Sequence, residues 1–185
     1  MFNKAIYWIF RQFGWDIDGE IPKLDKFIIP VIPHTTNWDF IIGLMTKWSL
    51  NLRVNYIGKH QLFRFPIGFI FRGLGGRPVY RYKRNDLVRQ VADIYKEEKR
   101  FVLALAPEGT RSKVPKIKTG FYHIALEANI PIQPIGFDFK RKRVVVGELM
   151  YPTGDKEKEI QKLMDFYLTI PPKHPKDGID ENTTW

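Results

Sequence analysis

Residues 26–45, KFIIPVIPHTTNWDFIIGLM, join an apolar run, a short polar stretch and a second apolar run. The first run predicts a buried strand, and Pro30 favours an edge position or a bulge for it. The second run, from Trp38 onwards, predicts a helix. A strand followed directly by a helix is the repeating unit of layered α/β folds, in which the sheet is largely parallel.

The polar stretch between the two runs contains His34 and Asp39, five positions apart. Residues three or four apart share a helix face, whereas residues five apart do not. We therefore expect His34 in the loop and Asp39 in the first turn of the helix, where they can pair. A carboxylate on the second ring nitrogen fixes the tautomer of a histidine and stabilises its cation. A histidine after a strand is more often structural, so the pair alone leaves its role open.

The rest of the chain alternates between strand-like and helix-like patterns, with no internal repeat. This alternation predicts a single-domain α/β layered fold with a mostly parallel central sheet flanked by helices. The predicted strands cover residues 53–58, 77–81, 100–107, 130–139 and 143–151, and the predicted helices cover 60–76, 85–99, 120–129 and 155–170.

The 185 residues are enough for one domain with a single core. We assign residues 1–20 to a short amphipathic N-terminal helix, 21–170 to the main domain, and 171–185 to a loose, proline-rich tail. The N-terminal helix can lie in a membrane interface or pack on the protein's own core, and both alternatives stay open.

The charge of the chain limits the kinds of partner that we expect for it. The net charge is +10, and residues 53–89 contain nine lysines and arginines against one acidic residue. Such a field attracts nucleic acid, phosphorylated small molecules or an anionic membrane, unless it is only a solvated face. No nucleic-acid-binding signature is present, so a nucleic-acid partner is not expected.

Several kinds of site are absent from the sequence. There is no cysteine, which excludes disulfides, thiolate nucleophiles and cysteine zinc sites and suits a reducing compartment. The histidines show no convincing metal spacing, so we expect no metal. No apolar run is long enough to span a bilayer, and we see no signal peptide. A Gly-x-Ser-x-Gly elbow is also missing, so a nucleophile for His34 to activate would come from the substrate.

A second polar stretch, APEGTRS at 106–112, follows the apolar strand predicted at 100–107. Gly109 allows close backbone approach, Thr110 offers a hydroxyl, and Arg111 offers a planar fork for phosphate. Glu108 can pair with an arginine or bind a substrate hydroxyl, although a polar turn explains the stretch equally well. In parallel sheets, sites form beyond the carboxyl ends of strands, so His34 and Glu108 can meet there.

Taken in order, these segments resemble the four blocks of the glycerolipid acyltransferase family, the 1-acylglycerol-3-phosphate O-acyltransferases and their relatives. HTTNWD (34–39) is similar to the first block and APEGTRS to the third. GKHQLFRFPIGFIFRGLGGRPVYR (58–81) resembles the second, with Lys59 and Arg81 at the expected places, and IPIQPIGF (130–137) resembles the fourth. Ala106 and Arg77-Pro78 depart from the usual pattern.

The resemblance implies that an acyl group moves from a thioester, either acyl-CoA or acyl carrier protein, to a lysophospholipid hydroxyl without a bound cofactor. The acceptor implied most directly is 1-acylglycerol-3-phosphate. His34 then acts as general base and Asp39 orients it. The residues implied to bind substrate are Glu108, Gly109, Thr110, Arg111, Arg81 and Lys59.

The resemblance also implies a peripheral protein at the cytoplasmic face of the membrane. Two alternatives stay open. The acceptor can be another lipid, such as a lyso-ornithine lipid, or the chain can be a non-catalytic protein that binds anionic membranes. The apolar residues 63–71 can line an acyl groove or belong to an ordinary core.

Overall fold

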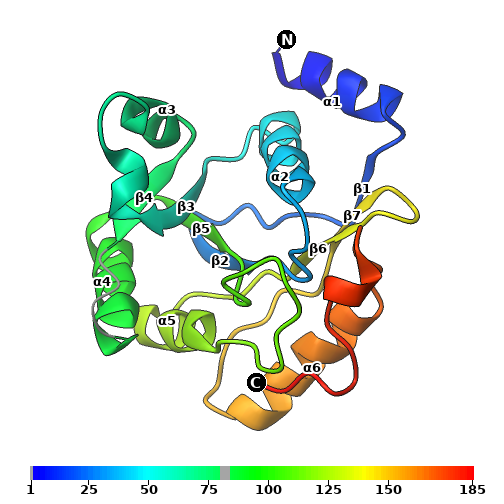
Figure 1. The fold of residues 1–185 in the computed structure, drawn as a ribbon. Coiled ribbons are helices and arrows are strands. Elements are labelled where there is room, and N and C mark those ends of the chain that lie inside the picture. Colours follow the sequence, from blue (N-terminus) through cyan, green and yellow to red (C-terminus); the bar gives the residue numbers. More distant parts are fainter. Residues whose placement is uncertain (1, 80–83) are drawn as a thin grey trace.

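Within residues 2–79 and 84–185, which a computed structural model describes, four parallel strands form a central sheet (Figure 1). Because these strands run in one direction, their carboxyl ends lie at the same edge of the sheet. Their order across the sheet is β2 (Lys26–Pro30), β5 (Phe101–Leu105), β3 (Val54–Lys59) and β4 (Gly76–Val79). β2 is the last strand of this four-stranded sheet, but the edge position predicted from Pro30 is wrong, because the outer side of β2 is hydrogen-bonded too. The amide of Ile28 donates to the carbonyl of Pro131 at 3.0 Å, and the amide of Gln133 donates to that of Ile28 at 2.8 Å.

A smaller, three-stranded sheet continues beyond β2. Its order is β1 (Asp16–Asp18), β7 (Arg143–Val146) and β6 (Ile135–Asp138), with β1 parallel and β6 antiparallel to β7. Parallel bridges from Ile28 to Ile132 and from Val31 to Ile135 join the two sheets. The predicted α/β fold with a mostly parallel central sheet is therefore confirmed.

Helices cover both faces of the sheets (Figure 1). α1 (Phe2–Gln12) and α2 (Trp38–Ser49) lie on one face, whereas α4 (Arg84–Glu97), α5 (Gly120–Ala128) and α6 (Lys156–Leu168) lie on the other. α3 (Gly68–Gly73) follows a 3-10 turn at His60–Phe63, and a second 3-10 turn is at Pro175–Asp177.

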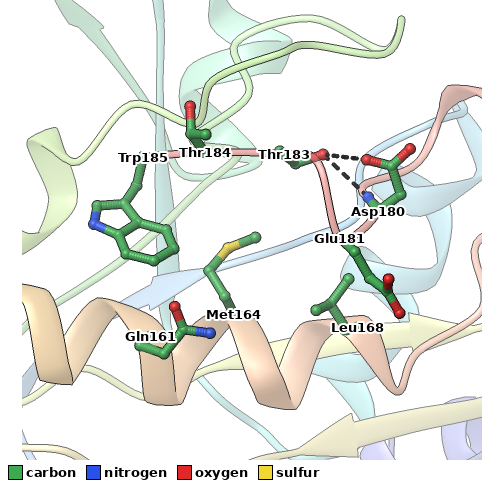
Figure 2. Close-up of a pocket in the computed structure, with 8 residues that line it drawn as sticks. All are labelled: Gln161, Met164, Leu168, Asp180, Glu181, Thr183, Thr184 and Trp185. Atoms are coloured by element: carbon green, nitrogen blue, oxygen red, sulfur yellow. Dashed lines mark hydrogen bonds between the residues drawn. The ribbon is translucent and has the colours of Figure 1, made fainter.

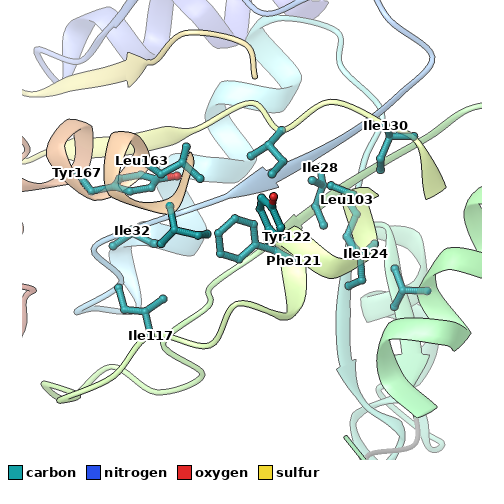
Figure 3. Close-up of a cluster of buried hydrophobic side chains, with 14 of the residues drawn as sticks. Ile28, Ile32, Leu103, Ile117, Phe121, Tyr122, Ile124, Ile130, Leu163 and Tyr167 are labelled. Atoms are coloured by element: carbon teal, nitrogen blue, oxygen red, sulfur yellow. The ribbon is translucent and has the colours of Figure 1, made fainter. Parts of the chain in front are cut away.

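The strand side chains alternate between two apolar clusters. Ile28 of β2 joins the cluster beneath α4, α5 and α6, part of which Figure 3 shows. Its neighbours Phe27 and Ile29 join the other cluster, with Phe10 of α1 and Ile42 of α2. This period of two is what a strand buried on both faces requires, because successive side chains point to opposite faces.

Four predicted elements are wrong in extent. The N-terminal helix assigned to residues 1–20 ends at Gln12, and β1 follows it. The strand expected at 130–139 is regular only at β6, because Pro131 and Pro134 lack the N–H that a ladder needs. The strand expected at 143–151 ends at Val146. The helix expected at 60–76 is divided into the 3-10 turn and α3, with Pro66 between them.

α1 packs on the protein's own core, which is one of the two alternatives left open for it, and also exposes aromatic side chains. Phe10 is buried in the protein's own core, whereas Phe2, Trp8 and Phe13 are exposed. Arg11 forms an ion pair with Asp16, which ties the end of the helix to β1. α1 therefore packs on the domain with one face and presents aromatic side chains to the surroundings with another.

The segment 171–185 differs from the loose tail predicted for it. The amide of Phe139 donates to the carbonyl of Pro171 at 3.2 Å, and the amide of Ile117 donates to the carbonyl of Thr184 at 2.8 Å. Composition did not reveal this order, because backbone hydrogen bonds to distant segments leave no pattern in a polar sequence.

Candidate active site

His34 and Asp39 form a side-chain pair at the carboxyl end of β2. His34 lies in the loop after the strand, and Asp39 is the second residue of α2. The imidazole Nδ1 is 2.9 Å from Asp39 Oδ2. The expected arrangement, with the histidine in the loop and the aspartate in the first helical turn, is confirmed.

The carboxylate of Asp39 also organises the loop. Its Oδ2 accepts a hydrogen bond from the amide of Thr36 at 2.9 Å, and the amide of Trp38 donates to Thr36 Oγ1 at 3.3 Å. Asp39 is only 2% exposed, and a carboxylate is favoured near a helix N-terminus. The imidazole of His34 is 21% exposed, so substrate can reach the ring while its partner stays buried.

Glu108 connects this loop to the loop after β5. β2 and β5 are parallel neighbours, so both loops leave the same edge of the sheet. The amide of His34 donates a hydrogen bond to Glu108 Oε2 at 2.8 Å. The two stretches singled out in the sequence are therefore in direct contact, as their positions after neighbouring strands predicted.

Burial perturbs the ionisation of Glu108, which is 4% exposed. Desolvation is the largest effect and raises the pKa of its carboxyl to about 7, and the nearby charge of Asp39 adds to the increase. The hydrogen bond from the His34 amide and the charge of the imidazole oppose it. Near neutral pH, the Glu108 carboxyl is therefore divided between its two forms.

This raised pKa makes stability depend on pH. The unfolded chain releases the Glu108 proton near pH 4.5, whereas the folded chain holds it up to about pH 7. Stability from this group is therefore lost as pH rises through that window, by about 3 kcal/mol in total. We expect Glu108→Gln to remove this loss. Between pH 4 and pH 8, the free energy of unfolding of the variant should therefore rise by about 3 kcal/mol relative to that of the wild type. Urea unfolding at several pH values measures the difference.

Glu127→Gln is the matched control, because Glu127 is exposed on α5. Its unfolding free energy should follow that of the wild type at every pH. If Glu108→Gln also runs parallel to the wild type, the raised pKa is wrong.

Gly109 lies in the turn of this loop, directly after Glu108. Its φ is +72°, a conformation that favours glycine, and an added Cβ would lie 2.6 Å from Nζ of Lys118. The amide of Gly109 donates to the carbonyl of Ala106 at 3.1 Å, and the amide of Lys118 donates to that of Pro107 at 3.3 Å. An ammonium group therefore lies against the turn next to Glu108. The sequence analysis did not single out Lys118, because only the folding back of the chain brings it there.

The other residues predicted to bind substrate show fewer contacts in the structure. Arg111 is exposed in the same loop, and Thr110 Oγ1 accepts a hydrogen bond from the amide of Ser112 at 3.4 Å. Lys59 is the exposed last residue of β3, the strand beside β5, and so lies at the same edge of the sheet. Arg81 lies outside the described residues.

This edge of the sheet provides a histidine paired through one ring nitrogen, a buried carboxyl and several exposed cations. Within residues 2–79 and 84–185, no group of histidine, aspartate and glutamate side chains could hold a metal ion. The arrangement suits proton transfer at His34 on a substrate that carries negative charge.

Comparisons with known proteins identify the family to which the chain is similar. A family model described as acyltransferase matches residues 18–138, a range that contains His34, Asp39 and the loop from Glu108 to Arg111. The chain is 26% identical over 137 residues to a 1-acyl-sn-glycerol-3-phosphate acyltransferase from Haemophilus influenzae, covering 69% of this chain. It spans about half the length of that relative, 55%.

The fold is similar to that of a solved acyltransferase structure. The solved structure is the crystal structure of PlsC, the 1-acyl-sn-glycerophosphate (LPA) acyltransferase from Thermotoga maritima, with a TM-score of 0.58 and 20% sequence identity. The match covers 90% of this chain and 75% of that one.

Proposed function

The chain belongs to the acyltransferase family, and from this membership and the geometry at His34 we propose a reaction for it. A fatty acyl group moves from an acyl thioester to a hydroxyl of a lysophospholipid-type acceptor, most directly a 1-acylglycerol-3-phosphate. The observation that carries the proposal is the 2.9 Å contact between His34 Nδ1 and Asp39, which leaves the second ring nitrogen for the acceptor hydroxyl.

The proposed mechanism uses His34 as general base. Its Nε2 takes the proton of the acceptor hydroxyl while the oxygen attacks the thioester carbonyl. The tetrahedral intermediate then expels the thiolate, which takes the proton back from the imidazolium. Asp39 stabilises the imidazolium through Nδ1. The acceptor oxygen forms the new bond to the acyl carbon and the donor sulfur loses its bond to that carbon, so every atom that changes bonding partner on the acyl carbon belongs to the substrates and no acyl-enzyme forms.

The acceptor phosphate is assigned to the cations at this edge of the sheet. Arg111 offers two parallel donors that match phosphate geometry. Lys59 completes the proposed set at this edge, together with the Gly109–Thr110 turn. Arg81, which lies outside the described residues, is added to the set only on the family resemblance. The donor is acyl-CoA or acyl carrier protein, and no bound cofactor takes part.

We also propose that the protein acts as a peripheral protein at the cytoplasmic face of the membrane. Two groups of exposed apolar side chains support this: Phe2, Trp8 and Phe13 in and directly after α1, and Phe65 (96% exposed), Ile67, Phe69 and Ile70 around α3. Aromatic side chains favour the headgroup region, and the basic residues at 53–89 favour anionic lipid. Among the helices of residues 2–79 and 84–185, none is long and apolar enough to cross a bilayer.

The test of the reaction is the release of free thiol. Purified protein with acyl-CoA and lysophosphatidate should release thiol and form the diacyl product. A non-catalytic membrane-binding protein would float with anionic vesicles equally well but release no thiol, so thiol release decides between the two. A panel of acceptors that includes a lyso-ornithine lipid identifies the acceptor class.

Arg111→Ala should mainly weaken the use of phosphate-bearing acceptors. Loss of a charge-assisted pair costs about 1.5–3 kcal/mol, so we expect KM for lysophosphatidate to rise roughly 10- to 100-fold, with a smaller change for a neutral acceptor. Arg53→Ala is the matched control, because Arg53 is exposed just before the amino end of β3, at the opposite edge of the sheet. Equal losses on charged and neutral acceptors would show that Arg111 does not bind phosphate.

A further inference from the structure

Residues 171–185 run past both loops of the candidate site, although they lie outside the 18–138 range that the family model matches. The first contact is with the loop that carries His34. The amide of His174 donates to Thr35 Oγ1 at 3.4 Å, and Lys173 Nζ lies 4.9 Å from the ring centre of Trp38. Thr35 directly follows His34, and Trp38 directly precedes Asp39.

The second contact is with the loop between β5 and α5. Asp180 forms an ion pair with Lys113, two residues beyond Arg111. The hydroxyl of Thr183 donates to Asp180 Oδ1 at 3.1 Å and accepts from the Asp180 amide at 3.0 Å, which holds that carboxylate in place (Figure 2). Thr183 is buried, so this turn is a built feature of the segment.

The third contact is a strand-like pairing of Thr184 with residues 115–117 of the same loop. The amide of Thr184 donates to the carbonyl of Pro115 at 3.0 Å, and the amide of Ile117 donates to the carbonyl of Thr184 at 2.8 Å. A parallel bridge therefore joins Lys116 to Thr184. Trp185 then packs against the apolar cluster beneath α5 and α6.

We propose that residues 171–185 form a clamp that orders the 106–119 loop and holds it in register with the His34 loop. In the context of the proposed function, on which this role rests, Asp180 and Thr184 are positioning residues for the acceptor-binding loop. They act through Lys113 and Pro115 without touching substrate.

The need for a clamp follows from the length of the loop. Fourteen residues, 106–119, separate β5 from α5. Ordering a loop of this length costs conformational entropy, which its contacts must offset. The hydrogen bonds donated by the amides of Gly109 and Lys118 close the base of the loop. The hydrogen bond from the His34 amide to Glu108 fixes one further point of the loop. The contacts of Asp180 and Thr184 hold residues 113–117, directly after Arg111.

The clamp does not fill the space between itself and α6. A cavity of about 300 Å3 remains there, between Met164 and Leu168 of the helix and Glu181 and Trp185 of the segment (Figure 2). Packing on α6 is therefore incomplete, and the hydrogen bonds and the ion pair add to the attachment that Ile179 and Trp185 provide. Single substitutions at Asp180 and Thr184 therefore test the polar part of this attachment.

Hydrogen–deuterium exchange of the 106–119 loop tests the clamp without substrate. Asp180→Asn keeps an oxygen for Thr183 but loses the charge opposite Lys113, and should speed exchange in the loop about three-fold. Thr184→Pro removes the amide that bonds Pro115 and should speed it more than ten-fold. Glu181→Gln removes the same charge as Asp180→Asn one residue away, on an exposed side chain, and should match the wild type.

The kinetic readout separates positioning from general stability. Asp180→Asn should raise KM for the acceptor about three- to ten-fold and leave KM for the acyl thioester unchanged, with the melting temperature close to that of Glu181→Gln. Loop exchange equal to that of Glu181→Gln in both variants would overturn the clamp, as would faster exchange without a change in acceptor KM. A wild-type protein that releases no thiol would overturn the proposed function, and exchange would still decide whether the segment orders the loop.

Discussion

His34→Ala is expected to lower kcat for acyl transfer by about 10²–10⁴-fold, the range typical of a positioned general base. The imidazole is the proton acceptor in the proposed mechanism, and the enzyme supplies no nucleophile to compensate for its loss. The ring is partly exposed and is paired through Nδ1 with Asp39, so its removal should leave the fold intact. Thiol release under saturating substrate, together with a thermal unfolding curve, measures both parts of this expectation.

His123→Ala is the control for this experiment. His123 is exposed on α5 and contacts the ring of Tyr122, with no carboxylate partner in the described residues, so its loss should leave kcat unchanged. Equal turnover by wild type and His34→Ala would remove His34 from the mechanism. A large loss of both kcat and thermal stability would instead point to a structural histidine.

Asp39→Asn is expected to lower kcat by roughly 10²–10⁴-fold, because the imidazolium formed in the reaction loses its counter-charge and its fixed tautomer. The asparagine oxygen can still accept from the amide of Thr36, which Asp39 Oδ2 does at 2.9 Å. The loop should therefore keep its path, and KM for both substrates should change little. Steady-state kinetics for both substrates separate the two effects.

Asp138→Asn is the matched control, since Asp138 is also a fully buried aspartate but pairs with Arg141 instead of a histidine. It should cost stability without a comparable loss of kcat. If Asp39→Asn and Asp138→Asn lower kcat alike, the effect of Asp39 comes from burial of an aspartate and not from orientation of His34.

The two carboxylates at this site have different surroundings, although both are buried. Asp39 accepts from the His34 ring and the Thr36 amide, whereas Glu108 accepts from the His34 amide. Desolvation dominates at Glu108 and raises its pKa to about 7. Among the described residues, Oδ1 of Asp39 has no hydrogen-bond partner. The charge of Asp39 contributes to the raised pKa of Glu108.

Local patterns were sufficient for the strand, loop and helix around His34. The apolar run before it and the apolar run after Trp38 predicted β2 and α2, and the five-residue spacing predicted how His34 and Asp39 pair. The meeting of His34 with Glu108 also followed from the sequence, because both come directly after strands of a parallel sheet. These features depend on residues near each other in the chain, or on a general rule of sheet topology.

Other features had no such signal. The prolines at 131 and 134 shortened a predicted strand, since an apolar run does not by itself provide the amides of a ladder. Lys118 reaches the Gly109 turn only because the 106–119 loop folds back on itself. Residues 171–185 read as a loose tail, yet they pair with Thr35 and Pro115, far away in the sequence.

The sequence by itself determined the layered α/β architecture, the pairing of His34 with Asp39 and the loop that faces them. Periodicity and spacing carry that information, because they reflect which side chains share a strand or a helix face. Only the tertiary structure decided the ionisation of Glu108 and the path of residues 171–185. Burial and hydrogen bonds between distant segments control both, and neither leaves a pattern in the local sequence.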